Sequence, residues 1–465
     1  MTPPRRLLGV SITAAIVIAN MIGTGVFTST GLLAHGVHDP AAILIAWGVG
    51  GVLALCGAAA YAELGAMMPE AGGEYVYLSR AYHPAVGFLS GWVSLTAGFS
   101  APIAASAIAF ATYLGKLVPA LAPSSAQGAV AIALIALITS LHAFDTRLGG
   151  WVQAGFTAAK VLLIVGFVAL GLTAGHGDWH NLHARNGGLA NLTTPSFAIA
   201  LMYVSFAYSG WNAAAYVAGE VRRPERTLPR SLLAGTGVVM ALYVLLNLVF
   251  LYAVPSEVLA GPGTPPGEFH GIVEVGDAAA RALLGDRAAA LVTSVIALTL
   301  VSAVSAMVMA GPRVYVGMAA HRALPEPLGR HSRRGVPTIA VVTQGALAIA
   351  FVLVGDLGEL IRFVAFTLAI FAALTVAAVF VLRRRGHRAP YRTFGYPVTP
   401  ILFIALSGWI AYAQIEENPE ESLVVLGVLA AGGALYGAFG RGTSRAGRRA
   451  GALPEARVVG DPHAP

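Results

Sequence analysis

Charged residues and cysteine are scarce in this chain. Only 11% of its 465 residues are Asp, Glu, Lys or Arg, whereas about 25% is typical of a soluble domain. Cysteine occurs once, as Cys56 inside an apolar run, so no intrachain disulfide can form. Hydrophobic residues make up 57% of the chain, and the mean hydropathy is +0.73. This composition excludes an ordinary soluble protein and predicts one integral membrane domain in a lipid bilayer.

Lysine is nearly absent as well, since the chain has two lysines beside 27 arginines and a net charge of +7. The placement of these residues says more than their sum. With the N-terminus in the cytoplasm, 23 of the 29 Lys and Arg residues fall in segments on the cytoplasmic side. This bias predicts cytoplasmic termini and an even number of spans in the cell membrane. It favours membrane topology over nucleic-acid binding as the reason for the basic balance.

Long apolar runs recur along the chain and predict an all-α integral membrane protein with twelve transmembrane helices. The first run, from residue 7 to about 34, is too long for the core of a signal peptide, and we expect it to remain as a span. The tail 441–465 is rich in Gly, Arg and Ala, and we expect it to be a disordered cytoplasmic segment. The predicted spans lie at about 8–33, 41–65, 85–114, 128–144, 149–174, 195–219, 231–254, 288–312, 337–355, 359–382, 397–415 and 421–440.

Span 1 is interrupted by Gly23-Thr24-Gly25, where a membrane helix is expected to be most regular. Lipid offers no partner to unpaired backbone groups, so a break at this depth is tolerated where it faces a cavity. Discontinuous helices are the usual way in which transporters form a binding site at the membrane midplane. Close packing at a helix crossing is the alternative explanation for such a glycine pair.

The span at 195–219 contains a second interruption. Its centre, 206–212, reads FAYSGWN, which is too polar and too broken by glycine for a helix that faces lipid. Spans 1 and 6 are the first members of two five-span units. Two interrupted spans at corresponding positions are the sequence signal of an inverted-repeat transporter, and this pairing favours a substrate site over packing.

A broken helix presents groups that suit both ends of an amino acid zwitterion. Exposed N–H groups after a break favour a carboxylate, and exposed carbonyls before it favour an ammonium group. We therefore predict that residues 23–26 bind a carboxylate, that carbonyls of 18–21 and near Phe206 bind an amine, and that the aromatic residues shape the side-chain pocket or act as a gate. The predicted substrate-binding residues are Ile18, Ala19, Met21, Ile22, Gly23, Thr24, Gly25, Val26, Phe206, Ala207, Tyr208, Ser209, Gly210, Trp211 and Asn212.

Four stretches of the chain are similar to motifs of one family of membrane proteins. In chain order they are GTGVF at 23–27; YAEL at 61–64 with GGEYVY at 72–77; FAYSGWN at 206–212 with EVRRPERTLP at 220–229; and PYRTFGYP at 390–397. With these motifs in order at the expected topological positions, the chain resembles the amino acid–polyamine–organocation (APC) superfamily of permeases. The resemblance covers all twelve predicted spans.

The resemblance implies a leucine-transporter-like fold, in which 8–174 and 195–382 form a 5+5 inverted repeat. Two extra helices at 397–440 would complete one transporter domain over 1–440, which works by alternating access without a cofactor or a bound metal. The Gly-Trp-Asn form of span 6 is most similar to the L-type amino acid transporter branch and its bacterial relatives. Eukaryotic light chains of that branch bind a partner glycoprotein through a loop cysteine. Because Cys56 lies within span 2, no disulfide-linked heavy chain is expected here, and the oligomeric state stays open.

Lys160 is the clearest ionisable residue inside a predicted span. It lies about ten residues into span 5, roughly 15 Å along the helix axis, and is too deep to reach the membrane surface easily. In the family that the chain resembles, a span-5 lysine stands where sodium-coupled members of the fold bind sodium, and it contacts the unwound part of span 1. The resemblance thus implies sodium-independent transport, with either proton coupling or exchange. A fixed cation that braces the break is an alternative and compatible role for Lys160.

Three acidic residues, Glu63, Glu74 and Glu220, lie near the cytoplasmic ends of predicted spans. We expect these residues to form ion pairs with arginine that latch an inner gate, rather than to carry protons. This expectation applies above all to Glu63 and Glu220. No carboxylate falls in the middle of spans 1, 3, 6, 8 or 10. A substrate with a cationic side chain would need a desolvated anionic partner, so this absence disfavours one.

The sequence therefore predicts a sodium-independent transporter of neutral amino acids. An enzyme is disfavoured because the chain has neither a His-Glu-x-x-His nor a Gly-x-Ser-x-Gly motif. Two alternatives stay open: a cationic amino acid or polyamine antiporter of the same fold, and an amino acid sensor that does not transport.

Overall fold

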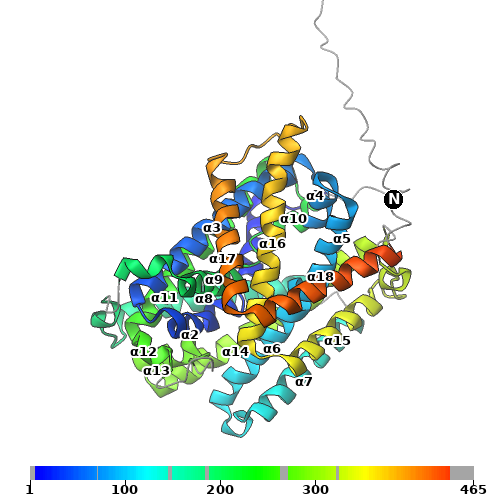
Figure 1. The fold of residues 1–465 in the computed structure, drawn as a ribbon. Helices are drawn as coiled ribbons and strands as arrows, with labels where there is room; N and C mark the ends of the chain where they lie inside the picture. The colour runs from blue at the N-terminus through cyan, green and yellow to red at the C-terminus, as the bar shows by residue number, and fades with distance from the viewer. Residues whose placement is uncertain are drawn as a thin grey trace, which may run out of the picture.

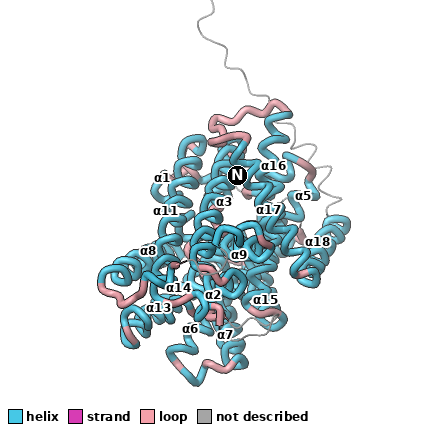
Figure 2. The backbone as a smooth tube through the Cα atoms, turned by 60° about the vertical axis from the view of Figure 1, so that its left-hand side comes forward, coloured by secondary structure: helices cyan, strands magenta, loops and turns pink. Residues whose placement is uncertain are grey.

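The computed structural model describes residues 6–70, 72–144, 149–183, 188–261, 271–320 and 324–439. Within these ranges the chain forms helices and loops but no strand, as Figure 2 shows. One isolated parallel β-bridge joins Leu8 to Val221. The all-α class predicted from the sequence is therefore confirmed for the described residues, whereas the predicted disordered tail 441–465 lies outside them.

The described residues up to Thr193 form eight α-helices. A π-helical segment, Ser94–Ser100, joins the fifth of these helices to the sixth, and short 3₁₀ turns lie at Pro119–Leu121, Trp179–Leu182 and Gly188–Thr193. The eight helices are α1 (Val10–Met21), α2 (Gly25–Val37), α3 (Pro40–Met67), α4 (Glu74–Ala81), α5 (Pro84–Val93), α6 (Ala101–Leu117), α7 (Ser124–Phe144) and α8 (Gly149–Thr173).

From Pro195 on, the residues that the structure describes form ten α-helices, with 3₁₀ turns at Ala218–Glu220 and Glu326–Gly329. The ten helices are α9 (Pro195–Tyr208), α10 (Ala213–Tyr216), α11 (Pro224–Ala253), α12 (Ser256–Leu259), α13 (Val275–Leu284), α14 (Asp286–Ala320), α15 (Thr338–Val354), α16 (Leu357–Arg384), α17 (Val398–Glu417) and α18 (Pro419–Phe439).

The described helices include nine that are long and apolar enough to cross a membrane, with α5, the π-helical segment and α6 counted as one. The pair α1 and α2, bent by 43° at its break, raises the number to ten. Helices α9 and α15 are apolar but have only 14 and 17 residues. Apolar helices thus lie at all twelve predicted positions, ten as candidate spans and two as shorter helices. The span predicted at 195–219 is short because its helix ends before Gly210.

Several helices begin at residues that cap them. The Asp39 side chain accepts hydrogen bonds from the backbone of Ala41 and Ala42, with Pro40 in the first turn of α3. At the start of α16, Asp356 and Glu359 form a reciprocal capping box. These caps satisfy backbone N–H groups that would otherwise be unpaired at the helix start.

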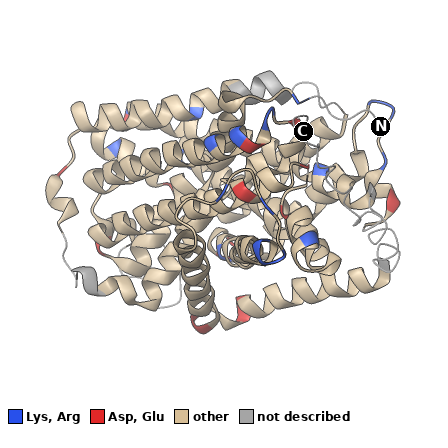
Figure 3. Cartoon of the chain, turned by 90° about the horizontal axis from the view of Figure 1, so that it is seen from above, with Lys and Arg blue, Asp and Glu red and all other residues tan. Residues whose placement is uncertain are grey.

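The broken helices lie inside the largest apolar core. Helix α2 packs on α9, and α11 packs on both α3 and α1. A second apolar cluster joins α6, α7, α14 and α15, and Figure 1 shows α7 and α15 side by side. In the same view α17 runs beside α16, and α18 lies across the molecule, where it contacts α5. Charged positions are sparse along the helices, as the view from above shows (Figure 3).

Candidate functional site

The first break separates α1 from α2 at residues 22–24. Helix α1 ends when the N–H of Ile22 donates to the carbonyl of Ile18, 3.0 Å away, and Ile22 itself is extended. Helix α2 starts at Gly25, and the N–H of Phe27 donates to the carbonyl of Thr24 at 3.1 Å. The helix is therefore interrupted at the place where the Gly23-Thr24-Gly25 sequence predicts a break.

The N–H groups that follow this break are free to meet a ligand. Those of Thr24, Gly25 and Val26 donate no hydrogen bond to any described residue. The N–H of Gly23 faces the Tyr243 hydroxyl instead. Unpaired N–H groups at the start of a helix carry partial positive charge and suit an anion. The carboxylate site predicted at 23–26 stays a prediction, for which the N–H groups of Thr24, Gly25 and Val26 are available and that of Gly23 is engaged.

The carbonyls before the break are more occupied than the sequence suggests. The carbonyl of Met21 accepts from the Tyr243 hydroxyl at 2.6 Å, and that of Ile22 accepts from Lys160 Nζ at 3.0 Å. Because Ile18 is also engaged within α1, the carbonyls of Ala19 and Asn20 are the ones in this turn that accept no hydrogen bond from a described residue. The amine site predicted over 18–21 stays a prediction, within which the carbonyls of Ala19 and Asn20 are unused.

The second break separates α9 from α10 at residues 209–212. Gly210 has a φ of +95°, a value that favours glycine. The carbonyl of Phe206, which the sequence assigns to the amine, accepts from the N–H of Ser209 at 2.9 Å. This bond uses one of the two lone pairs of the carbonyl oxygen, so the assignment of the Phe206 carbonyl to the amine stays a prediction.

The two breaks lie against each other, and glycine permits the approach. A Cβ on Gly25 would lie 2.4 Å from the Cα of Ala207, and a Cβ on Gly210 would lie 2.7 Å from the carbonyl oxygen of Asn20. Around Gly23, by contrast, a Cβ would meet no atom closer than 3.9 Å. Gly25 is thus a packing residue, as in the alternative explanation of the glycine pair, whereas Gly23 borders open space.

A cavity of about 80 Å³ lies beside the second break. None of the span-1 residues predicted to bind substrate lines it, so the two predicted halves of the site do not share this cavity. Of the predicted span-6 residues, those at the break itself line it: Phe206, Tyr208, Ser209, Gly210, Trp211 and Asn212. Its other walls are α3, α16 and α17, together with Glu74.

The aromatic residues of span 6 have different surroundings. Trp211 lies edge-on to Tyr61, with ring centroids 4.7 Å apart, and close to Phe403. Tyr208 is fully buried, and its hydroxyl donates to the carbonyl of Trp47 at 3.0 Å. All three aromatic residues line the cavity, and the hydroxyl of Tyr208 is held by its hydrogen bond to α3.

Lys160 lies in the interior, with an exposed fraction of only 1%. Its ammonium group joins α8 to the carbonyl of Ile22 in the first break. No carboxylate among the described residues forms an ion pair with it. The contact with the unwound part of span 1, implied by the resemblance, is present in the structure.

Glu63 forms the ion pair that the sequence favours, with Arg383 at the end of α16. The two side chains make a bidentate contact with both distances 2.7 Å, and Glu63 is buried. The backbone N–H and the hydroxyl of Thr393 donate to the same carboxylate at 2.7 and 2.5 Å. The guanidinium group of Arg383 also lies 3.7 Å from the centre of the Tyr396 ring. This cluster connects the YAEL stretch to the PYRTFGYP stretch.

Glu220 does not form the predicted ion pair with any described residue. Its side chain is exposed, and its backbone carbonyl accepts from the N–H groups of Leu7 and Leu8 at 2.9 and 3.0 Å. The N–H of Arg222 returns a bond to the carbonyl of Leu8 at 2.9 Å. The connection between the two broken helices at this point is therefore made by backbone, because the segment before α1 runs alongside residues 220–222.

Glu74, which the sequence groups with the latch residues, lies instead beside the second break. It is buried with an exposed fraction of 6%, and its Oε1 accepts from the Tyr61 hydroxyl and from Nδ2 of Asn212, 2.9 Å away. No described arginine, lysine or histidine pairs with it. The sequence places no carboxylate within span 6, and this one reaches the break from a loop helix.

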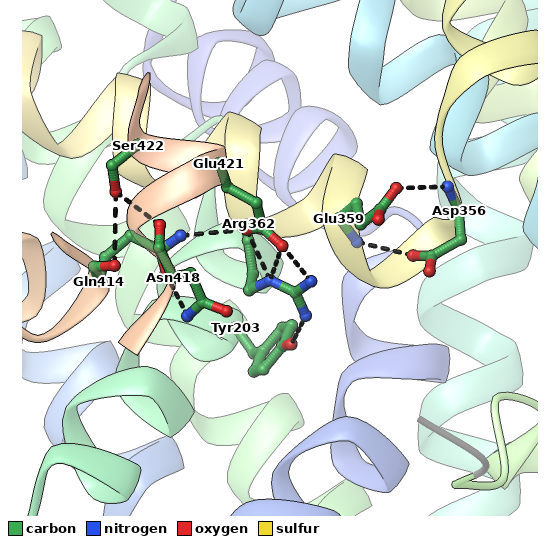
Figure 4. Close-up of polar contacts among 8 residues, drawn as sticks. All are labelled: Tyr203, Asp356, Glu359, Arg362, Gln414, Asn418, Glu421 and Ser422. Carbon is green, nitrogen blue, oxygen red and sulfur yellow. Dashed lines mark hydrogen bonds and ion pairs between the residues drawn. The ribbon is translucent and has the colours of Figure 1, made fainter. Parts of the chain in front are cut away.

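Arg362, like Lys160, is a basic residue within a predicted span. Its guanidinium group binds Glu421 at the start of α18, with Nε 2.8 Å from Oε2, and donates to the Tyr203 hydroxyl of α9 at 2.7 Å (Figure 4). Gln414 of α17 also donates to Glu421, at 3.1 Å. Arg362 thus joins α16 to α9 and α18, and Glu421 extends these contacts to α17, which accounts for a charge at this depth. The residues that the structure describes contain no cluster of His, Cys, Asp and Glu suited to hold a metal.

Comparison with known families supports what the fold and the two helix breaks indicate, a membrane transporter. The amino acid permease family matches residues 8–428, and the chain belongs to it. This membership places the chain in the APC superfamily, near the L-type branch, as a multi-pass membrane transporter of amino acids rather than an enzyme.

Individual relatives agree with this assignment. The serine/threonine exchanger SteT of Bacillus subtilis is 30% identical over 411 residues, which cover 87% of this chain and 90% of SteT. The human b(0,+)-type amino acid transporter 1 is 28% identical over 430 residues, covering 90% and 84%. The human large neutral amino acids transporter small subunit 2 is 27% identical over 440 residues, covering 93% and 80%.

Proposed function

We propose that this chain is a sodium-independent secondary transporter of neutral amino acids in the cell membrane, working as a proton-coupled carrier or an exchanger. In this proposal, twelve spans form a 5+5 inverted repeat with two extra helices, and both termini are cytoplasmic. No cofactor, metal or disulfide-linked heavy chain takes part. Cys56 is a buried free thiol on α3, which agrees with the last point.

The observation that carries the proposal is the contact between Lys160 Nζ and the carbonyl of Ile22 in the first break. A buried ammonium group bound to a break carbonyl supplies the positive charge that a sodium ion would otherwise bring to this place. A cation of this kind stays with the protein, so the transport cycle has no need of external sodium.

Support for a neutral substrate comes from the relatives and from the first break. SteT is named as an exchanger of serine and threonine, and another relative as a transporter of large neutral amino acids. The N–H groups of Thr24, Gly25 and Val26 suit a carboxylate, and the carbonyls of Ala19 and Asn20 suit an amine. A zwitterion with an uncharged side chain satisfies both sets of groups without a further ion pair.

The test is uptake of labelled amino acids by purified protein in proteoliposomes. We expect saturable uptake and counterflow, unchanged when choline replaces external sodium, and competition by serine, threonine and leucine. A strict requirement for sodium would overturn the proposal, because an ammonium group and a sodium ion would compete for one position. Binding without counterflow would identify a sensor.

A cationic substrate is the second candidate, favoured by the Glu74 carboxylate in the wall of the cavity at the second break. Competition by lysine, arginine or polyamines that exceeds competition by serine and leucine would favour this reading. The same liposomes serve for both measurements.

A further inference from the structure

The cavity beside the second break contains one acidic group with an unused oxygen. Both hydrogen bonds to Glu74, from Tyr61 and from Asn212, go to Oε1. The other carboxylate oxygen, Oε2, accepts none from a described residue, although Glu74 lines the cavity and is more than nine-tenths buried.

The groups that face Glu74 offer no compensating charge. Helix α3 contributes the phenol of Tyr61, α4 that of Tyr77 and α10 that of Tyr216, while α16 contributes the Thr375 hydroxyl beside Tyr61. The α17 residues of the cavity wall are Phe403, Ser407 and Ile410, none of which titrates.

The charged residues nearest in sequence are already engaged with each other. Glu63 pairs with Arg383, and Glu70 pairs with Arg80 of α4. A phenol with an ordinary pKa of about 10 stays neutral at physiological pH. An ionised Glu74 would therefore be a buried anion without a cation, which is unfavourable, whereas a protonated Glu74 is not.

We propose that Glu74 is a proton-binding site, in which the proton occupies Oε2 at the cavity and its occupancy is linked to the position of the second break through Asn212. The proton comes from water and returns to it, and the charge of the side chain changes from −1 to zero with no other bond made or broken. This inference rests on the proposed transport function, for which it names the coupling residue.

The link to the break follows from the hydrogen bond between Asn212 and Glu74. An ionised carboxylate accepts a hydrogen bond more strongly than a neutral carboxyl, so the charged form holds Asn212 at the start of α10. Protonation weakens this bond and frees the break to move. Proton binding and movement of the break therefore influence each other to an equal extent.

Burial raises the pKa of the Glu74 carboxyl above its ordinary value, and the hydrogen bonds from Tyr61 and Asn212 partly offset this effect. Because the unfolded chain lacks this burial, the folded state takes up the proton at a higher pH than the unfolded state does. Glu74 therefore adds stability at acidic pH, and this contribution is lost as the pH rises through its raised pKa.

The experiment measures protonation directly and transport separately. Infrared difference spectra of the purified full-length protein on acidification should show a carboxylic acid C=O band that is lost in E74Q. In proteoliposomes, uptake by the wild type should depend on pH, and E74Q should give a flat profile. The matched control is E70Q, which changes an exposed carboxylate in the same loop and should keep the wild-type band and profile.

A second variant covers the case in which E74Q fails to fold. Y61F removes one donor to the carboxylate and keeps the carboxyl group, so the midpoint of the infrared band should shift to higher pH. A band that persists in E74Q, an unaltered pH profile in E74Q, or an unshifted midpoint in Y61F would overturn the proton site. If the wild type takes up no amino acid although the Glu74 band is present, the proposed function is overturned and the proton site is still supported.

Discussion

Gly23 and Gly25 are two residues apart, but they have different surroundings. Gly25 packs against the backbone of Ala207, whereas Gly23 borders open space and has no positive φ. One glycine thus sets the contact between the broken helices, and the other leaves room beside the free N–H groups of α2. Substitution at the two positions separates packing from ligand binding.

We expect G23A to fold normally and to bind substrate about tenfold more weakly, because its methyl group fills the space where a carboxylate would approach the N–H groups. This loss corresponds to about 1.4 kcal/mol, similar to one hydrogen bond to a charged group. The measurement is the KM for uptake in proteoliposomes together with Tm in detergent.

G25A is the comparison for G23A. Its Cβ collides with Ala207, so it should lower stability by about 1–3 kcal/mol and lower Tm. Unchanged substrate affinity in a well-folded G23A protein would show that the substrate carboxylate does not bind at this break.

At the scale of elements, Glu63 and Arg383 fasten α3 to the end of α16 and to the loop at Thr393. We expect R383Q to lower stability by about 3–5 kcal/mol, because it leaves a buried carboxylate without a cation. The double variant E63Q/R383Q removes the uncompensated charge and should recover part of the loss. Thermal unfolding of the purified proteins measures both effects, and equal Tm values for R383Q and the wild type would contradict the latch.

The two breaks could be predicted from the sequence because glycine and polar residues inside an apolar run are a local signal. The contact of Gly25 with Ala207 and that of Glu74 with Asn212 could not, since each depends on how segments distant in sequence meet. The Glu220 prediction failed for a related reason. A charge near arginines in sequence suggests an ion pair, but at this position the backbone carbonyl makes the contact.

The contacts of Arg362 with other helices could not be predicted from the sequence either. Its charge inside a span signals a function or a partner, but the sequence does not say which. The partners come from α9 and α18, the latter 59 residues further along the chain (Figure 4).

At the scale of the whole molecule, the segment before α1 and the segment after α10 are joined by the bridge of Leu8 with residues 220–222. L8P removes one donor of this bridge, whereas L8A keeps it. One hydrogen bond contributes about 1 kcal/mol. We therefore expect L8P to shift the equilibrium between joined and separated segments about fivefold toward separation.

Spin labels on cysteines introduced at Ser11 and Arg223, both exposed, report this separation as a broader distance distribution in L8P. The native Cys56 is buried and does not compete for the label. Equal distributions in L8P, L8A and the wild type would show that the bridge does not hold the two ends together.

The bridge also limits how many arrangements a gate built from these two half-helices can adopt. Two half-helices that swing separately have four combinations, of which the mixed ones leave a partial opening. In the proposed transport cycle, half-helices whose ends stay tied at Leu8 and Val221 would move together and would have two, both open or both shut. For a carrier this is a safeguard against leakage, because ions escape through half-open states and not through a gate that changes in one step.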